Sequence, residues 1–267
     1  GIGSITSNSS IRNAFAAGAG YRLMNDFRAR TLQGLLWNFV NQFGQQFIMM
    51  VVSIVLARML APRMFGLIGL ITVFTGFASL FVELGFGAAL IQKEDVSELY
   101  LSSVFWVNCF CGVLLTLLFM IMAPVIARFY NEPLLFPLTC VLSVNFFVSS
   151  LGLVHMTLLR KNLAFRPIAA ARIIAGGLAG MLAIGMACRG FGVWSFVGQS
   201  LFTGLVLVVL LWSFSPWRPR WMFSWRAIRE LSRFGLNYTG TQTMGYWVRN
   251  IDKLLIGRFC GAGALGL

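Results

Sequence analysis

Long segments without a single Asp, Glu, Lys or Arg constrain this chain more than any other feature of its sequence. A helix needs about 20 apolar residues to cross the hydrocarbon layer of a membrane. We expect spans at residues 31–57, 64–91, 99–127, 133–159, 167–188 and 190–214, of which the second continues past Glu83 and the fifth is interrupted by Arg172, with a less apolar seventh helix at 232–257. Backbone polar groups inside a membrane must be satisfied within each helix. The chain is therefore predicted to be an all-α polytopic membrane protein.

The composition excludes a soluble fold. Hydrophobic residues make up 58% of the chain and charged residues only 11%, against about 25% charged residues in globular proteins. The net charge is +13, which in a soluble chain would suggest nucleic-acid binding. Here the basic residues form short clusters between apolar segments, as is typical of loops that face anionic lipid. We therefore expect membrane lipids, and not nucleic acid, as partners.

The connections between the predicted spans are too short to hold a soluble domain. With the N-terminus in the cytoplasm, most basic residues fall on the cytoplasmic side, and the other side receives only Arg58, Arg63, Arg128 and Arg189. This asymmetry predicts a cytoplasmic N-terminus. The expected organisation is a partly disordered cytoplasmic lead-in (1–30), a six-helix bundle (31–214), a cytoplasmic interfacial linker (215–230) and the first helix of a second bundle (231–267).

A weak internal repeat supports this division. Residues 31–67 align without gaps with residues 231–267, and Gln42 then meets Gln242 while Arg58 meets Arg258. Six spans lie between the two copies, so both would start from the same side of the membrane. The pattern predicts two pseudo-symmetric bundles with a substrate site between them. Within the first bundle, Gly176 and Gly180 form a GxxxG motif that predicts close helix packing.

Four segments carry a family resemblance: "LARMLAPRMFGLIGL" (56–70), "FVELGFGAALIQKEDVSE" (81–98), "GFGVWSFVGQSL" (190–201) and "NIDKLLIGRFCGAGALGL" (250–267). Together they resemble the polysaccharide flippases of the multidrug/oligosaccharidyl-lipid/polysaccharide exporter superfamily, of which this would be the N-terminal half. One departure is Arg63-Met64 after Pro62, where family members often carry acidic residues.

The resemblance implies a function as well as a fold. It implies alternating access in the bacterial inner membrane, driven by an ion gradient, with an undecaprenyl-pyrophosphate-linked oligosaccharide as substrate. A polysaccharide polymerase and the export machinery would be further partners. A lipid II flippase or a cation-coupled drug exporter of the same superfamily is the alternative within transport. A membrane glycosyltransferase or polymerase is a third hypothesis, although the loops are too short for it.

Polar residues inside spans are the candidates for a substrate cavity, because such residues are costly there and tend to be functional. The first span carries a polar stripe, which would line the cavity or hydrogen-bond to neighbouring helices. Its members are Asn38, Asn41, Gln42, Gln45 and Gln46. The seventh helix offers a matching stripe of Asn237, Thr241, Arg249 and Asp252.

Charged residues complete the set of candidates. Glu83, before the glycine-broken stretch at Gly85 and Gly87, would couple an ion or simply end a shorter helix. Arg172 would bind pyrophosphate or extend to lipid headgroups. Asp252 would couple an ion or pair with Arg249. The sequence has no phosphate-binding GxxxxGK loop, HExxH motif or acidic DxD pair, so we expect neither an enzyme nor a metal or other cofactor.

Overall fold

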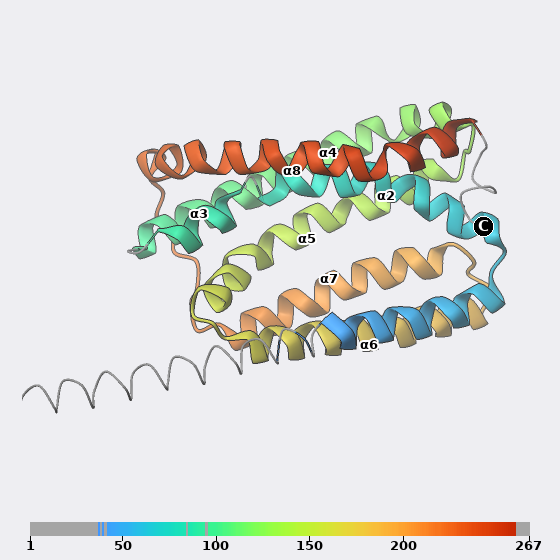
Figure 1. The fold of residues 1–267 in the computed structure, drawn as a ribbon, viewed down its shortest axis with the longest axis horizontal. Coiled ribbons are helices and arrows are strands. Elements are labelled where there is room, and N and C mark those ends of the chain that lie inside the picture. Colours follow the sequence, from blue (N-terminus) through green and yellow to red (C-terminus); the bar gives the residue numbers. More distant parts are fainter. Residues whose placement is uncertain (1–36, 38, 40–41, 84, 94–95, 260–267) are drawn as a thin grey trace, which may run out of the picture.

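The computed structural model describes residues 37, 39, 42–83, 85–93 and 96–259, and the regular elements in this part of the chain are all α-helices. The first helix, Gln42–Met59, is followed by α2 (Pro62–Glu83), α3 (Phe86–Gln92), α4 (Glu98–Tyr130), α5 (Leu135–Lys161), α6 (Phe165–Cys188), α7 (Trp194–Phe214) and α8 (Trp225–Phe259). Figure 1 shows them as one elongated bundle.

Six segments of the described chain are long and apolar enough to cross a membrane. They are the first helix, α2 together with α3, α4, α5, α6 and α7. The predicted all-α polytopic membrane fold is thereby confirmed. Helix α8, the predicted seventh helix, does not meet the criterion, because polar and charged residues are spread along its length. It nevertheless packs lengthwise against α2, α3 and α4.

The helices alternate in direction between two ends of the bundle (Figure 1). One end, which we call the basic end, carries the α3–α4 turn, the α5–α6 turn and the α7–α8 linker. Its basic residues are Lys93, Arg160, Lys161, Arg166, Arg218, Arg220, Arg226 and Arg229. Helix α5 is central: it packs against α2, α3, α4, α6 and α7. The first helix and α8 both run away from the basic end.

The second span is broken at Gly85, where the sequence predicted a glycine-broken stretch. Gly85 caps the N-terminus of α3 with a φ of 66°, in the left-handed region that favours glycine. A Cβ atom at Gly85 would lie 2.5 Å from the carbonyl oxygen of Gly235 in α8. The break therefore lets the α2–α3 junction rest directly on the backbone of α8.

The first helix packs on the small-residue face of α6. Ala175, Ala179 and Ala183 are fully buried, and a Cβ atom at Gly180 would lie 2.5 Å from Cγ2 of Val52. A Cβ atom at Gly176 would make only ordinary contact, 3.9 Å from Cγ2 of Ile48. Within the predicted GxxxG motif, Gly180 is thus the position that requires glycine.

A methyl group at Gly180 should destabilise the bundle. We expect Gly180→Ala to cost about 1–3 kcal/mol through overpacking against Val52 and to lower the melting temperature of the detergent-solubilised protein. Gly177→Ala is the matched control on the same helix, because a Cβ atom there meets nothing within 4 Å. It should leave the melting temperature unchanged or raise it through helix propensity. Equal melting temperatures for both variants would contradict the packing of the first helix on α6.

The linker between α7 and α8 is held on the first half of α4. The backbone N–H groups of Arg220 and Ser224 donate to the hydroxyls of Ser102 (3.2 Å) and Ser103 (2.9 Å), two serines with no exposed surface. The indole of Trp221 stacks on Trp106, with ring centroids 4.3 Å apart. Helix α8 begins at Trp225, earlier than the boundary at 231 that the sequence predicted, because Ala227, Ile228 and Leu231 already pack as one buried face.

Candidate functional site

The described bundle contains a cavity of about 360 Å³ at its basic end, between α2, α3, α5, α6 and α7. We call it the arginine cavity. Most of its lining is apolar side chains and glycines, and its polar lining residues are Ser79, Ser149, Thr157, Arg160 and Arg172. Its volume falls in the range of about 300–1,000 Å³ that is typical of ligand sites, and so does the combination of an apolar wall with few polar groups.

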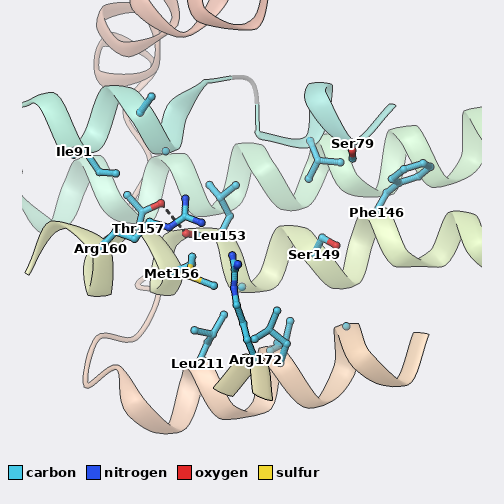
Figure 2. A pocket seen from close by; sticks show the side chains of 17 residues that line it. Ser79, Ile91, Phe146, Ser149, Leu153, Met156, Thr157, Arg160, Arg172 and Leu211 are labelled. Atoms are coloured by element: carbon cyan, nitrogen blue, oxygen red, sulfur yellow. Dashed lines mark hydrogen bonds between the residues drawn. The ribbon is translucent and has the colours of Figure 1, made fainter. Parts of the chain in front are cut away.

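Two arginines from different helices reach into this cavity (Figure 2). Arg160 lies in the last turn of α5. Arg172 lies on α6 about two turns, or about 10 Å, beyond the first residue, Phe165. Its side chain is half-buried and points into the space beside α5, not along the surface of the bundle. A guanidinium group is a donor only and cannot lose its charge in a protein, so the cavity is suited to an anion.

A second cavity of about 240 Å³ adjoins the first. We call it the hydroxyl cavity. Ser79, Phe146 and Ser149 line both cavities. The remaining polar residues of the hydroxyl cavity are Thr72 and Thr75 from α2, Asn145 from α5 and Ser200 from α7. An uncharged polar groove thus continues from the arginines toward the middle of the bundle.

Ion pairs tie α8 and the linker to the first bundle at the basic end. Nζ of Lys93 lies 2.6 Å from Oε1 of Glu230, and the Tyr100 hydroxyl donates to Oε2 of Glu230 (2.6 Å). The hydrogen bond to Glu230 raises the pKa of Lys93, and the same bond lowers the pKa of Glu230. Arg220 pairs with Glu98 at 2.7 Å. Because Glu230, Arg220 and Glu98 are at least half exposed and Lys93 is partly exposed, each pair adds little stability by itself.

Of the predicted cavity residues, the structure places Arg172 in the arginine cavity. Asn38 and Asn41 lie outside the described residues. Gln42 is exposed and Gln45 half-buried on the first helix, and neither lines the arginine or hydroxyl cavity. Gln46, from the same stripe, lines a third cavity of about 450 Å³ together with Gln199 of α7. The role of the stripe as a sugar-binding wall stays a prediction.

The other predicted residues lie apart from these cavities or are described only by their backbone. Glu83 is the last residue of α2, and its side chain, like that of Asn237 in α8, lies outside the described part. Thr241, Arg249 and Asp252 are exposed on α8. The ion pairs between described residues do not include one between Arg249 and Asp252. Coupling by Glu83 or Asp252 stays a prediction.

Sequence reasoning missed the hydroxyl cavity. One signal was available, because Thr72, Thr75 and Ser79 follow one another at helical spacings of three and four and so share one face of α2. Serine and threonine are common inside membrane helices, where they hydrogen-bond to their own backbone, so this stripe was not distinctive. Asn145 and Ser200 face it only through the packing of α5 and α7.

Comparison with known proteins identifies the family. A family model described as "Polysaccharide biosynthesis protein" matches residues 55–267, which is more than half of the chain. The chain belongs to this family. The resemblance seen in the sequence to polysaccharide flippases is thereby confirmed at the level of the polysaccharide biosynthesis proteins. No solved structure matches the chain.

Three curated relatives show where the similarity lies. The teichuronic acid biosynthesis protein TuaB of Bacillus subtilis is 33% identical over 196 residues, which are 72% of this chain and 40% of TuaB. The succinoglycan biosynthesis transport protein ExoT of Rhizobium meliloti is 26% identical over 86% of this chain and 47% of its own length. The lipopolysaccharide biosynthesis protein WzxC of Escherichia coli is 26% identical over 90% of this chain and 49% of its own length. The chain thus spans about half the length, or less, of these relatives.

Proposed function

We propose that this protein flips lipid-linked oligosaccharide repeat units across the bacterial inner membrane for polysaccharide biosynthesis. The observation that carries the proposal is the arginine cavity, a cationic site in a bundle with six candidate membrane spans. The family match supports it, and one relative is named as a transport protein. The names of these relatives favour a saccharide cargo over drug export.

The site provides what the proposed cargo requires. The headgroup of a lipid-linked oligosaccharide is a pyrophosphate that carries sugars, and both parts must cross a hydrocarbon layer about 30 Å thick. Arg160 and Arg172 supply positive charge and fixed N–H donors for the pyrophosphate. The protein acts as a transporter and not as an enzyme in this proposal, with a second bundle of like orientation completing the path.

The basic residues support a particular orientation in the membrane. The eight basic residues at the basic end outnumber the described basic residues at the opposite end, which are Arg58, Arg63, Arg128 and Arg189 in the first bundle and Arg258 near the end of α8. By the positive-inside rule the basic end would face the cytoplasm, and the N-terminus with it. The arginine cavity would then open toward the side on which lipid-linked units are assembled.

A deletion strain tests the proposal. Without the gene, surface polysaccharide should be lost while lipid-linked repeat units accumulate on the cytoplasmic leaflet. Right-side-out spheroplasts treated with an impermeant glycan-labelling reagent would measure which leaflet the units occupy. Expression of the complete gene in the deletion strain should restore labelling of the lipid-linked units. The purified protein in proteoliposomes should move these units across the membrane without ATP. Equal labelling of the lipid-linked units with and without the gene would reject a flippase.

A further inference from the structure

We propose that the hydroxyl cavity binds the sugar nearest the pyrophosphate, so that the headgroup enters the bundle with its phosphates at the arginines and its sugar toward the middle of the bundle. This inference rests on the proposed function. It assigns the first sugar of the headgroup to a site inside the first bundle, between α2, α5 and α7. Each cavity has a different set of hydrogen-bonding groups that are not used within the protein.

The hydroxyls of α2 have already used their protons. The Thr72 hydroxyl donates to the carbonyl oxygen of Gly69 (2.8 Å), that of Thr75 to Ile71 (3.1 Å) and that of Ser79 to Gly76 (2.7 Å). A hydroxyl has one donor and two acceptor lone pairs. The three oxygens therefore face the cavity as acceptors, and a ligand must bring O–H or N–H donors to them.

Asn145 adds a stronger acceptor on the opposite wall. Its Nδ2 donates to the hydroxyl of Ser200 (3.4 Å), which leaves Oδ1 buried with no hydrogen-bond partner among the described residues. A Cβ atom at Gly204 would lie 2.5 Å from this Oδ1, so glycine leaves room for the amide. A buried carbonyl oxygen without a donor is costly. A ligand hydroxyl at this position would remove that cost.

The two cavities thus differ in charge and in the hydrogen-bonding groups that each adds to the residues they share. The arginine cavity offers guanidinium donors, which suit phosphate oxygens because these only accept. The hydroxyl cavity has no cationic group among its lining residues and adds the acceptor oxygens of Thr72, Thr75 and Asn145, which suit the many O–H groups of a sugar. Phe146 lines both cavities and is fixed edge-to-face on Phe119, with ring centroids 5.0 Å apart. Its ring provides an apolar surface for the C–H face of a sugar.

Binding to paired probes tests the assignment. Isothermal titration calorimetry on the detergent-solubilised product of the complete gene would compare farnesyl pyrophosphate with farnesyl pyrophosphate linked to one glucose. We expect the wild type to bind the glucosylated probe about 10-fold more tightly, as one or two additional hydrogen bonds would give. Asn145→Leu and Thr75→Val should each reduce this ratio at least 3-fold while leaving the affinity for farnesyl pyrophosphate unchanged, because both residues line the hydroxyl cavity and not the arginine cavity.

Matched variants separate the possible outcomes. Ser213→Ala is the control, because the Ser213 hydroxyl donates in the same manner to Val209 (2.9 Å) but does not line either cavity; it should keep the wild-type ratio. A wild-type ratio in both Asn145→Leu and Thr75→Val would overturn the sugar assignment, even though Arg172→Gln weakens both probes as the proposed function requires. Failure of the wild type to bind either probe would instead count against the proposed function. Asn145→Leu could also weaken both probes equally and only when Na⁺ is present. That result would assign the cavity to a cation and would also overturn the inference.

Discussion

Gly85→Ala is expected to abolish the stable fold of this protein or to lower its melting temperature more than any other glycine-to-alanine change discussed above. Two costs add at this position. A φ of 66° is unfavourable for a residue with a Cβ atom by about 1–2 kcal/mol. The new methyl group would also lie 2.5–2.9 Å from three backbone atoms of Gly235, and overpacking of this kind typically costs about 1–3 kcal/mol.

The backbone of α8 cannot relieve this contact as a flexible side chain could. Because stabilities of folded proteins are only about 5–15 kcal/mol, a combined loss of about 2–5 kcal/mol would remove much of the margin. We would measure the fraction of monodisperse protein and its melting temperature by fluorescence-detected size-exclusion chromatography, using the product of the complete gene in one detergent.

Two other glycines separate the two costs. Gly190 has a φ of 80°, and a Cβ atom there meets nothing within 4 Å, so Gly190→Ala carries the conformational cost alone. Gly177→Ala carries neither cost. We therefore expect stability to fall in the order Gly177→Ala, Gly190→Ala, Gly85→Ala. If Gly85→Ala and Gly190→Ala had the same melting temperature, the α2–α3 junction would not rest on α8.

The contact at Gly85 is one of several that join α8 to the first bundle. The Tyr246 hydroxyl donates to the carbonyl oxygen of Val73 (2.7 Å), and a Cβ atom at Gly76 would lie 2.5 Å from that hydroxyl. Trp247 packs against Phe77, with ring centroids 5.1 Å apart. In a two-bundle transporter, α8 would open the second bundle, and these contacts would lie where the bundles meet. Small residues on α2 and α3 would then set how closely the second bundle approaches the first.

The helices could be predicted from the sequence because length and charge decide them. A charge-free segment such as 99–127 has no alternative to a helix inside a membrane. The break in the second span was predicted from Gly85. The boundary between linker and α8 could not be placed, because Trp225 starts a helix whose first turns are held by buried contacts of Ala227 and Ile228.

The candidate site could be predicted only in part. Arg172 was identifiable because a charge inside a span is rare and therefore informative. Ser79, Ser149 and Asn145 were not, since a serine or an asparagine inside a span serves helix packing as readily as substrate binding. Which role applies depends on the groove between α2, α5 and α7, and that groove is a property of the tertiary packing.

Arg172→Gln is expected to reduce transport at least 10-fold. The change keeps a polar side chain of similar reach but removes the charge that faces the arginine cavity. A hydrogen bond to a charged group contributes about 1.5–3 kcal/mol, so its loss should weaken pyrophosphate binding by about 10- to 150-fold. Arg172→Lys keeps the charge and loses the planar fork of donors, so it should fall between the wild type and Arg172→Gln.

A neighbouring arginine on the same helix provides the control. The guanidinium of Arg166 lies over the ring of Trp37, 5.5 Å from its centroid, and does not line the arginine cavity. Arg166→Gln removes the same charge from the same end of α6 and should keep most of the transport. Surface polysaccharide and labelled outer-leaflet intermediates would be quantified in the deletion strain that carries each variant at equal protein level. Because the two variants differ in position and not in charge, equal losses would show that α6 acts through its attraction to lipid headgroups, whereas a loss confined to Arg172→Gln would place the anion in the cavity.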